Sequence, residues 1–384
     1  MDPQSGGPCQ GLRNLLPELA ALGVGNEVVS LDAPDAAFLG KDPFVIHAIG
    51  QGTGPWGYNK ALIPWLVKHM PSYDLVVVHG LWLHSSYATG RAARILRRQG
   101  KSVPYYVMPH GMLDPYFQKA EGRKIKAIRN YLYWKLLEGR LVNEAAGVLF
   151  TCEEELRLAR HSFSPYKPAK ELNIGYGIKE VPQADAMGLE SVNTSNGIPA
   201  GKPYILVLSR IHEKKGIDLA VAAYQEIAKT TTGLPTLVIA GPGLDTDYGR
   251  SLLEAAAGSP SIVFTGMLAG EAKWAAFRGA EAYLLPSHQE NFGISVVEAM
   301  ASSVPVLITN KVNIWREIKD GRAGIIGDDT LAGVTAMLRE WLSLSPEVKK
   351  QMGADAFNCF RNKFFVGEVA KQVALVLKKE VGNG

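Results

Sequence analysis

Cysteine is scarce in this chain of 384 residues: only Cys9, Cys152 and Cys359 occur, far apart in the sequence. An odd number of widely spaced cysteines predicts neither a disulfide framework nor a metal site, so we expect a reducing compartment. The sequence also lacks an apolar run of about 20 residues, which argues against a transmembrane helix. It shows no charged segment followed by an apolar one at its start, so no signal peptide is predicted. We therefore expect a cytoplasmic protein.

Neither sign of charge dominates, because 41 Lys and Arg stand against 37 Asp and Glu, for a formal net charge of +4. The excess of basic residues lies within residues 1–177. It is too small to predict nucleic-acid binding, although it fits a first half that meets an anionic ligand or surface. Hydrophobic residues make up 47% of the chain, and its length suffices for about two packed domains.

Short apolar runs alternate with amphipathic stretches along the whole chain. Continuous apolar strands separated by helices predict parallel sheets covered on both faces, so we expect an α/β fold. Strands are predicted at residues 75–79, 105–108, 147–151, 204–208, 236–240, 261–264, 282–285 and 304–308. Helices are predicted at residues 86–99, 125–145, 216–230, 268–278, 294–301 and about 360–379.

A segment without helical or strand periodicity, residues 178–202, is rich in Pro, Gly, Ser and Asn. It predicts a linker between an N-terminal domain of residues 1–177 and a C-terminal domain of residues 203–355. The last helix, within residues 356–384, is expected to follow a helix-poor stretch and could pack back on the N-terminal domain. The chain opens on the turn-like MDPQSGGP, so the first strand of the N-terminal sheet is expected to be absent.

The stretch SHQENFGISVVEAMA, residues 287–301, places two acids around a glycine at the start of a predicted helix. The first N–H groups of a helix have no internal acceptor and attract anions, phosphate above all. Gly293 lets a ligand approach the backbone closely, while Glu290 and Glu298 can accept hydrogen bonds from hydroxyl groups on either side. This pattern predicts a ligand with hydroxyls at both ends and phosphate between them, which is a nucleotide-sugar. The alternative is a surface helix whose acids are merely solvated.

Two cations follow the predicted strand at residues 204–208, namely Arg210 and Lys215 in VLSRIHEKKGID. Ligands of open α/β sheets bind at the carboxyl ends of the strands, where these two side chains are expected. Arg can fork onto phosphate oxygens and Lys adds a point charge, so together they would neutralise a departing diphosphate. A basic turn without a ligand remains the alternative.

The motifs SRIHEKKG, AGPG, FTG and SHQENFGISVVEAMASSVPVL, with SGGP, VVVHGLW, VMPHGMLDP and VLFTCEEE before them, resemble glycosyltransferase family 4, the glycosyl transferases group 1 type. The resemblance covers nearly the whole chain, and it is closest to enzymes of bacterial exopolysaccharide or O-antigen biosynthesis. It implies the GT-B fold, in which two Rossmann-like parallel-sheet domains face a central cleft. It also implies retaining, metal-independent transfer of a hexose, without a cofactor, from a nucleoside-diphosphate sugar to a saccharide or lipid-linked acceptor.

The resemblance also implies roles for individual residues. Arg210 and Lys215 would hold the diphosphate, Glu290 would meet the hydroxyls of the donor sugar, and Glu298 would bind the ribose. The imidazole of His110, in PHG, would lie near the anomeric carbon. The implied donor-binding set is completed by Gly6, Gly7, Gly241, Met267, Asn291, Phe292, Gly293 and Ile294.

Three further features have two interpretations each. Asp245-Thr246-Asp247 spells D-x-D, a metal motif of another glycosyltransferase fold, but a solvated loop explains it better. His79, Trp82 and His84 could line the acceptor side or serve only the structure. Residues 123–140 interleave basic and aromatic side chains, as suits a peripheral contact with an anionic membrane at its inner face. Alternatively, that helix is a solvated face over a core stripe of Ile128, Leu132 and Leu136.

Three functions remain open at this point. The order of Arg210, Lys215, Glu290 and Glu298 favours a glycosyltransferase. A nucleotide-sugar 2-epimerase shares the two-domain architecture, and a non-catalytic nucleotide-sugar-binding protein would keep the same site. Consumption of the donor that requires an acceptor would separate the first from the second, and any turnover would exclude the third.

Overall fold

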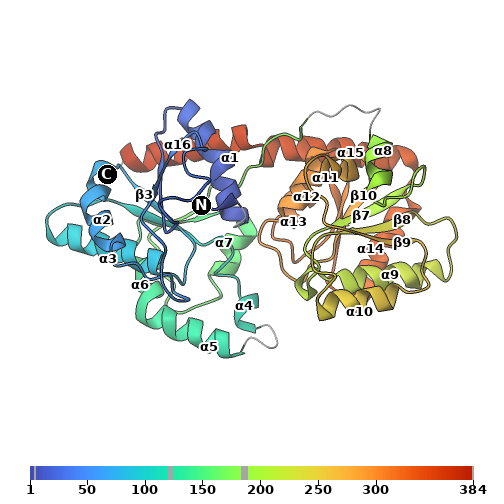
Figure 1. The fold of residues 1–384 in the computed structure, drawn as a ribbon, viewed down its shortest axis with the longest axis horizontal. Helices are drawn as coiled ribbons and strands as arrows, with labels where there is room; N and C mark the ends of the chain where they lie inside the picture. Colours follow the sequence, from blue (N-terminus) through green and yellow to red (C-terminus); the bar gives the residue numbers. More distant parts are fainter. Residues whose placement is uncertain (4–5, 120–123, 183–188, 383–384) are drawn as a thin grey trace. The chain divides into compact units, whose positions relative to one another are not determined.

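The computed structural model describes residues 1–3, 6–119, 124–182 and 189–382. Contacts divide the chain into two units. Figure 1 shows their helices and strands, coloured by position in the sequence. Unit 1 contains Met1–Gly177 and Val366–Gly384, and unit 2 contains Ile178–Phe365. Both units are α/β with parallel strands only, so the predicted fold class is confirmed.

Unit 1 is built on a four-stranded parallel sheet in the order β3-β4-β5-β6. Its strands are β3 (Val76–His79), β4 (Tyr105–Met108), β5 (Gly147–Phe150) and β6 (Glu171–Asn173). A second, two-stranded parallel sheet pairs β1 (Glu27–Ser30) with β2 (Val45–Ala48). The helices are α1 (Gly7–Ala21), α2 (Leu62–His69), α3 (His84–Arg98), α4 (Tyr116–Lys119), α5 (Lys124–Tyr133), α6 (Gly139–Glu144), α7 (Glu153–Ala159) and α16 (Val366–Gly382).

Unit 2 is built on a six-stranded parallel sheet in the order β12-β11-β10-β7-β8-β9. The strands are β7 (Tyr204–Leu208), β8 (Thr236–Ala240), β9 (Ile262–Gly266), β10 (Ala282–Leu285), β11 (Val306–Thr309) and β12 (Gly324–Gly327). The helices are α8 (Leu189–Ser195), α9 (Ile217–Ala228), α10 (Asp247–Ala256), α11 (Gly270–Gly279), α12 (Ile294–Ala301), α13 (Trp315–Asp320), α14 (Leu331–Ser343) and α15 (Pro346–Cys359). The order reverses between the neighbours β7 and β10, which places the loops after these two strands side by side.

All eight predicted strands are present, and their continuous apolar sequences follow from their burial. Strands β4, β5, β8, β10 and β11 are buried at every residue, because helices cover both faces of a parallel sheet. The sequence prediction omitted β1, β2, β6 and β12. These four strands have three or four residues and are partly exposed, so their apolar pattern is weak.

The C-terminal helix α16 belongs to unit 1, where it packs against α1. Val369, Val373 and Leu377 lie in one apolar cluster with Leu16 and Leu19 of α1. The stretch before this helix is not poor in helix, as the sequence had suggested, because α13, α14 and α15 occupy most of residues 315–359. Their apolar positions are separated by small and polar residues, which hid the helical period.

The segment predicted as a linker is partly folded onto unit 2. Residues 183–188 lie outside the described residues, but α8 follows them directly. Within α8, the buried side-chain amide of Asn193 donates to the carbonyl of Ala275 and to Tyr204 Oη, at 3.3 Å each. Unit 2 therefore includes α8, although the amino-acid composition of this segment had predicted a linker.

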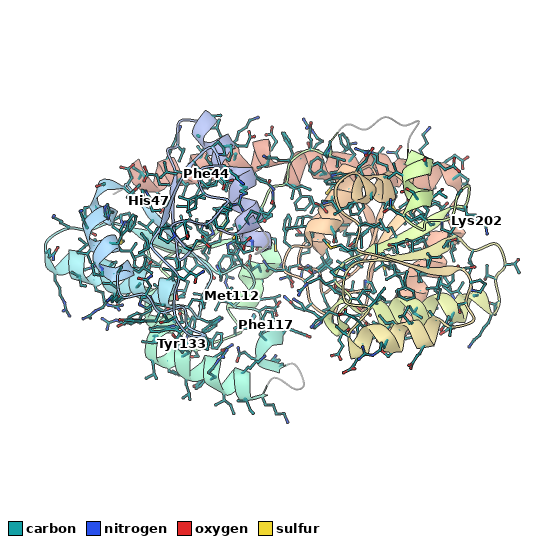
Figure 2. All side chains as sticks on the ribbon, viewed as in Figure 1. Phe44, His47, Met112, Phe117, Tyr133 and Lys202 are labelled. Atoms are coloured by element: carbon teal, nitrogen blue, oxygen red, sulfur yellow. The ribbon has the colours of Figure 1, made fainter. Side chains whose placement is uncertain are left out.

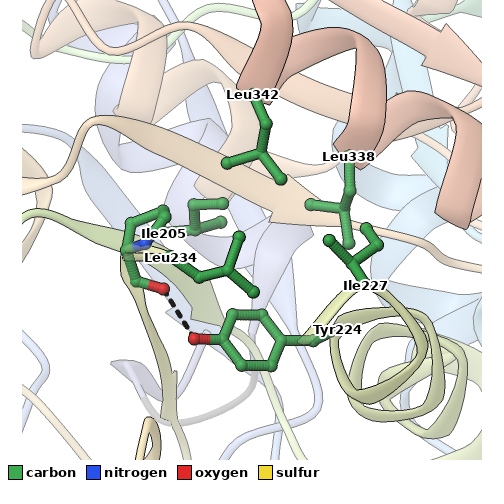
Figure 3. A pocket seen from close by; sticks show the side chains of 7 residues that line it. Ile205, Tyr224, Ile227, Leu234, Leu338 and Leu342 are labelled. Carbon is green, nitrogen blue, oxygen red and sulfur yellow. Dashed lines mark hydrogen bonds between the residues drawn. The ribbon is translucent and has the colours of Figure 1, made fainter. Parts of the chain in front are cut away.

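The structure also contains a small apolar pocket in unit 2, shown in Figure 3. Ile205, Ile227, Leu234 and Leu338 line it, and the hydroxyl of Tyr224 donates to the carbonyl of Pro235 at 2.9 Å. Pro235 directly precedes β8, so the pocket lies at the amino ends of the strands. It offers no polar group to a ligand and is a gap in the core packing.

Candidate functional site

The candidate donor site of unit 2 lies at the carboxyl ends of its strands, where loops and helix starts expose polar backbone groups. Lys215 ends a 3-10 turn, Glu213–Lys215, in the loop after β7. Glu290 lies in the loop after β10, the neighbouring strand of the sheet. The Glu290 backbone is fixed by two hydrogen bonds of 2.9 Å, from its N–H to Lys311 and from Asn313 to its carbonyl.

Lys215 and Glu290 form an ion pair across these two loops, and both side chains are largely buried. Burial alone would raise the pKa of Glu290, but the charges of Lys215 and Lys214 and the hydrogen bond from Lys215 outweigh it and lower that pKa. Glu290 is therefore a carboxylate at neutral pH, and it holds the Lys215 ammonium at a fixed place. A rigid cation beside a rigid carboxylate is suited to a ligand that carries both phosphate and hydroxyl groups.

Arg210 differs from Lys215 in being exposed, with no ion pair among the residues that the structure describes. The sequence predicted two fixed cations after β7, but only Lys215 is held by the protein. The reason is geometric: Lys215 faces the buried carboxylate of Glu290, whereas Arg210 follows β7 at the surface. Arg210 is free to adjust to a bound anion.

Helix α12 begins at Ile294, directly after Gly293. Gly293 has φ 77°, a left-handed conformation that glycine adopts without strain. The first N–H groups of the helix have no acceptor within it and lie at its positive end. Phe292 is buried edge-on against Phe364 at 5.7 Å, while Asn291 accepts a hydrogen bond from Asn313 at 3.3 Å. The loop before the helix is thus held in place by the ring contact of Phe292 and by the hydrogen bond to Asn291.

Glu298 lies one turn inside α12 and pairs with Lys273 of α11 at 2.7 Å. Burial raises the pKa of Glu298, and the charge of Lys273 partly opposes this effect. Lys273 Nζ also lies 4.1 Å from the centre of the Trp274 ring. Sequence reasoning missed Lys273, since a lysine on an amphipathic helix carries no signal of its own. The two acids of the site therefore each have a lysine partner.

The remaining predicted residues of unit 2 lie at the same edge of its sheet. Gly241 follows β8, and a side chain there would meet the carbonyl of Ser209 at 1.8 Å, so close packing of two loops requires this glycine. Met267 follows β9 with 70% of its side chain exposed. The predicted residues of unit 2 thus follow β7, β8, β9 and β10, which are neighbours in one sheet.

In unit 1, His110 follows β4 and contacts His79, which ends β3. The nitrogen atoms His79 Nδ1 and His110 Nε2 lie 2.9 Å apart, and the rings stack at 5.2 Å. Burial lowers the pKa of His79 to about 4; burial and the neighbouring histidine lower that of His110 to about 3. Both rings are neutral at pH 7, so one donates its N–H to the other. His110 is also in a left-handed conformation, with φ 51°.

A buried acid that sequence reasoning did not single out holds this loop. Glu155, in the motif VLFTCEEE, accepts hydrogen bonds from Gly111 N–H at 2.5 Å and from Thr151 N–H and hydroxyl at 2.8 and 2.6 Å. Gly111 directly follows His110, and its φ of 80° requires a residue without a side chain. This network joins the loop after β4 to the start of α7 and fixes the strained backbone at His110, as is common next to functional residues.

The glycine pair near the N-terminus forms the start of α1. Gly6 is its N-cap with φ 86°, and Gly7 is its first residue. The hydroxyl of Tyr176 donates to the carbonyl of Gly7 at 2.7 Å, which holds the helix start against the segment after β6. Gly6, Gly7 and His110 all belong to unit 1, whereas the other predicted site residues belong to unit 2.

The D-x-D sequence caps a helix. Thr246 is the N-cap of α10, and its hydroxyl oxygen accepts from Gly249 N–H at 3.0 Å. Asp247 is fully exposed and pairs with Arg250 at 2.5 Å. Within residues 1–3, 6–119, 124–182 and 189–382, no group of three His, Cys, Asp or Glu side chains could hold a metal ion.

Family comparisons agree with this arrangement in both halves of the chain. Residues 6–173 match the family described as glycosyl transferase 4-like domain. Residues 190–358 match the family described as glycosyl transferases group 1. Each half of the chain thus matches a glycosyltransferase family.

Curated relatives of this chain include a D-inositol 3-phosphate glycosyltransferase of an Arthrobacter species, 32% identical over 42% of the chain and 39% of the relative. The alpha-monoglucosyldiacylglycerol synthase of Streptococcus pneumoniae is 26% identical over 77% of the chain and 64% of the relative. The matches thus span less than two thirds of the length of either relative.

Solved structures resemble this chain over nearly its full length. A sucrose-phosphate synthase from Thermosynechococcus elongatus has a TM-score of 0.73 at 19% identity, covering 99% of this chain and 94% of its own. Anabaena HepE, solved in complex with UDP and glucose, has a TM-score of 0.73 at 16% identity, covering 98% and 97%. At these identities the likeness establishes the GT-B fold.

Proposed function

We propose that the protein transfers a hexose from a nucleoside-diphosphate sugar to a saccharide or lipid-linked acceptor, with retention of the anomeric configuration. One observation carries this proposal: two largely buried carboxylates, Glu290 and Glu298, each paired with a lysine, flank the first turn of α12. The acids can bind hydroxyl groups, and the helix end between them can bind an anion. This order matches a nucleotide-sugar, in which a diphosphate joins a sugar to a ribose. The expected pathway is bacterial cell-surface polysaccharide biosynthesis.

The side chains of the site would act mainly on the leaving diphosphate. Negative charge builds on it as the glycosidic bond breaks, and Lys215, Arg210 and the N–H groups of α12 would stabilise that charge. Glu290 would hold the sugar hydroxyls and Glu298 the ribose. The neutral imidazole of His110 would lie near the anomeric carbon and hydrogen-bond the sugar without adding positive charge. This chemistry requires no metal ion.

The names of similar proteins support the donor class and the range of acceptors. HepE was solved with UDP-glucose, and one relative is named for a glucosylated diacylglycerol. The direct test measures release of nucleoside diphosphate from UDP-, GDP- and ADP-sugars, with and without lipid-linked saccharide acceptors. Release that depends on the acceptor is expected. Conversion of the donor sugar without acceptor would indicate a 2-epimerase instead, and absence of any turnover would indicate a binding protein.

The proposed partners include a membrane surface at residues 123–140; Arg123 lies outside the described residues. Ile125, Ile128, Leu132 and Leu136, on α5 and the π-helical turn after it (Trp134–Glu138), are 85%, 63%, 55% and 75% exposed. The alternative core stripe of Ile128, Leu132 and Leu136 is therefore wrong. Helix α5 lies on the outside of unit 1 (Figure 1). The buried positions here are Asn130, Trp134, Glu138, Gly139, Leu141 and Val142.

Basic side chains alternate with this apolar stripe along the helix and favour an anionic partner. Lys124, Lys126, Arg129, Lys135 and Arg140 are all exposed. An exposed apolar stripe between basic residues suits the boundary of an anionic bilayer, where each basic residue adds about 1 kcal/mol of attraction. In the part of the chain that the structure describes, no helix is both long and apolar enough to cross a bilayer. We therefore expect peripheral contact with the inner face of the membrane.

Vesicle sedimentation tests this partner. The protein should bind phosphatidylcholine vesicles containing phosphatidylglycerol more tightly than pure phosphatidylcholine vesicles. The double variant Leu132→Ser/Leu136→Ser should lose roughly ten- to a hundredfold in affinity, because two large apolar side chains no longer enter the interface. Leu375→Ser is the matched control, since Leu375 is 71% exposed on α16. Equal binding by the double variant, or self-association in place of vesicle binding, would contradict the membrane contact.

A further inference from the structure

The loop after β3 is held in a strained conformation that the proposed donor chemistry does not use. Trp82 has φ 70°, which is unfavourable for a bulky side chain. Its N–H donates to Glu138 Oε1 at 3.1 Å, and the hydroxyl of Ser86 lies 2.6 Å from the same oxygen. Glu138 ends the π-helical turn Trp134–Glu138, a helix type that is frequent at functional sites. A strained backbone at Trp82 and a π-turn that ends in a buried acid therefore meet at this loop.

Glu138 is unusual because it is only 1% exposed and one of its carboxylate oxygens, Oε2, accepts no hydrogen bond from the described residues. Two neighbouring polar atoms, Trp56 Nε1 and the hydroxyl oxygen of Tyr133, have no hydrogen bond of good geometry in that part of the chain; the Trp56 indole is near enough to the Tyr133 hydroxyl to oppose the rise of its pKa. Buried polar atoms are nearly always paired, since leaving one unpaired costs free energy. Together they offer one carboxylate acceptor, one indole donor and one phenol.

These atoms lie within a cluster of aromatic rings at the same end of the sheet as His79 and His110. The Tyr133 ring lies 6.3 Å from the Trp56 ring and 6.3 Å from the Trp82 ring. Figure 2 labels Tyr133 in unit 1. Trp56 stacks on Tyr58 with an interplanar angle of 15°, and Tyr58 is 49% exposed. The aromatic cluster thus extends from the Tyr133 ring through Trp56 to the partly exposed ring of Tyr58.

We propose that Trp56, Tyr58, Tyr133 and Glu138 bind a pyranose ring of the glycosyl acceptor. Sugar hydroxyls both donate and accept hydrogen bonds, so one ring can satisfy the carboxylate, the indole N–H and the phenol at once. The apolar C–H face of a pyranose suits the electron-rich face of an aromatic ring. The strained Trp82 loop sets the position of the Trp82 ring, and Glu138 holds that loop through the Trp82 N–H. The role as acceptor site rests on the proposed transferase function, but binding of a sugar does not.

Titration of the full-length protein with methyl glycosides tests this site without any turnover. The probes are methyl α-glucoside, α-galactoside and α-mannoside, followed by tryptophan fluorescence and by saturation-transfer NMR. We expect saturable binding of at least one probe. Trp56→Phe and Tyr133→Phe each remove one polar atom and keep a ring, so each should weaken binding roughly three- to tenfold. Glu138→Gln should weaken it as well, and the two milder variants keep the test valid if Glu138→Gln does not fold.

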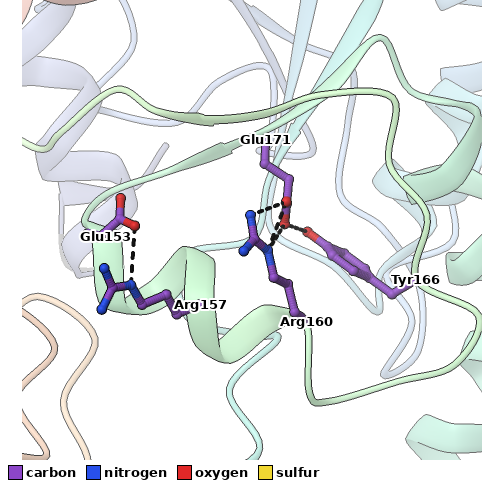
Figure 4. A network of polar contacts seen from close by, with 5 residues as sticks. All are labelled: Glu153, Arg157, Arg160, Tyr166 and Glu171. Atoms are coloured by element: carbon purple, nitrogen blue, oxygen red, sulfur yellow. Dashed lines mark hydrogen bonds and ion pairs between the residues drawn. The ribbon is translucent and has the colours of Figure 1, made fainter.

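Tyr166→Phe is the matched control in the same unit. Its hydroxyl contacts Glu171 at 3.0 Å in the separate network shown in Figure 4, where Arg160 also pairs with Glu171. This variant should bind the glycosides like the parent protein. The site is refuted if no glycoside binds, or if Trp56→Phe and Tyr133→Phe bind as tightly as the parent. Calorimetry with UDP, GDP and ADP on the same samples reports the donor site separately, so failure of the acceptor site and failure of the proposed function remain distinguishable.

Discussion

At the scale of single residues, the site consists of charges that hold one another in place. Glu290 fixes Lys215, Lys273 partners Glu298, and Glu155 holds the backbone beside His110. Fixed charges need little reorganisation when a transition state forms, which is the basis of electrostatic catalysis. The lysine of the first pair is therefore the side chain whose loss should affect turnover most.

Replacing Lys215 by Ala should lower kcat roughly 100-fold or more, the scale of one preorganised electrostatic contact. The change removes a cation from the leaving diphosphate and leaves Glu290 buried without its partner. Steady-state kinetics with the preferred donor measure the effect. Lys229→Ala, at the exposed end of α9, is the control and should keep kcat within a few-fold of the parent. An unchanged kcat in Lys215→Ala would remove this residue from the mechanism.

Glu138 should make the free energy of unfolding depend on pH. Burial raises its pKa to about 7, while Trp82 and Ser86 oppose the shift by hydrogen bonding. Glu138 therefore binds a proton more tightly in the folded state than in the unfolded state. Its contribution to the free energy of unfolding is fully present below pH 4.5 and is lost as the pH rises through about 7. The loss amounts to about 3 kcal/mol at most. Glu138→Gln should abolish this part of the slope in urea denaturation measured from pH 5 to 8, and an unchanged slope would show that Glu138 is not its source.

At the scale of elements, the buried strands and the start of α12 could be predicted from sequence, because both follow from local patterns. Ala282–Leu285 is apolar throughout, and Gly293 directly precedes the predicted helix. The partners of the acids could not be predicted in the same way. Lys273 and Glu138 lie on amphipathic helices, and only the packing of other elements shows that one pairs with Glu298 and the other is buried.

Gly293 tests the helix start as an element. Ala at φ 77° is strained, and its side chain would lie 3.1 Å from Val296. Gly293→Ala should therefore lower the free energy of unfolding by about 1 kcal/mol or more and weaken binding of nucleoside diphosphate. Gly258→Ala is the matched control, because Gly258 has φ 81° with no atom near its side-chain position. It should lose similar stability with unchanged diphosphate affinity, and equal affinity in both variants would argue against a phosphate at α12.

At the scale of the whole molecule, the boundary between the two structural units does not follow the order of the sequence. Both halves match glycosyltransferase families, yet α16, the last helix in the sequence, belongs to unit 1. The lysines and helix N–H groups of unit 2 would take the role of a metal ion, so turnover should survive EDTA. Strict dependence on Mg²⁺ or Mn²⁺ that Asp245→Ala abolishes would instead assign the D-x-D sequence to the donor.

The central claim is that Glu298 binds the ribose and Glu290 the sugar of one nucleotide-sugar donor. Calorimetric titration of nucleoside diphosphate into the parent, Glu290→Ala and Glu298→Ala tests it most directly, because this ligand has the ribose but no sugar. Glu298→Ala should lose roughly ten- to a hundredfold in affinity, since a hydrogen bond to a charged group contributes about 1.5–3 kcal/mol. Glu290→Ala should bind the diphosphate nearly as the parent does while turning over the sugar donor more slowly. Loss of diphosphate affinity in Glu290→Ala but not in Glu298→Ala would contradict the proposed orientation of the donor.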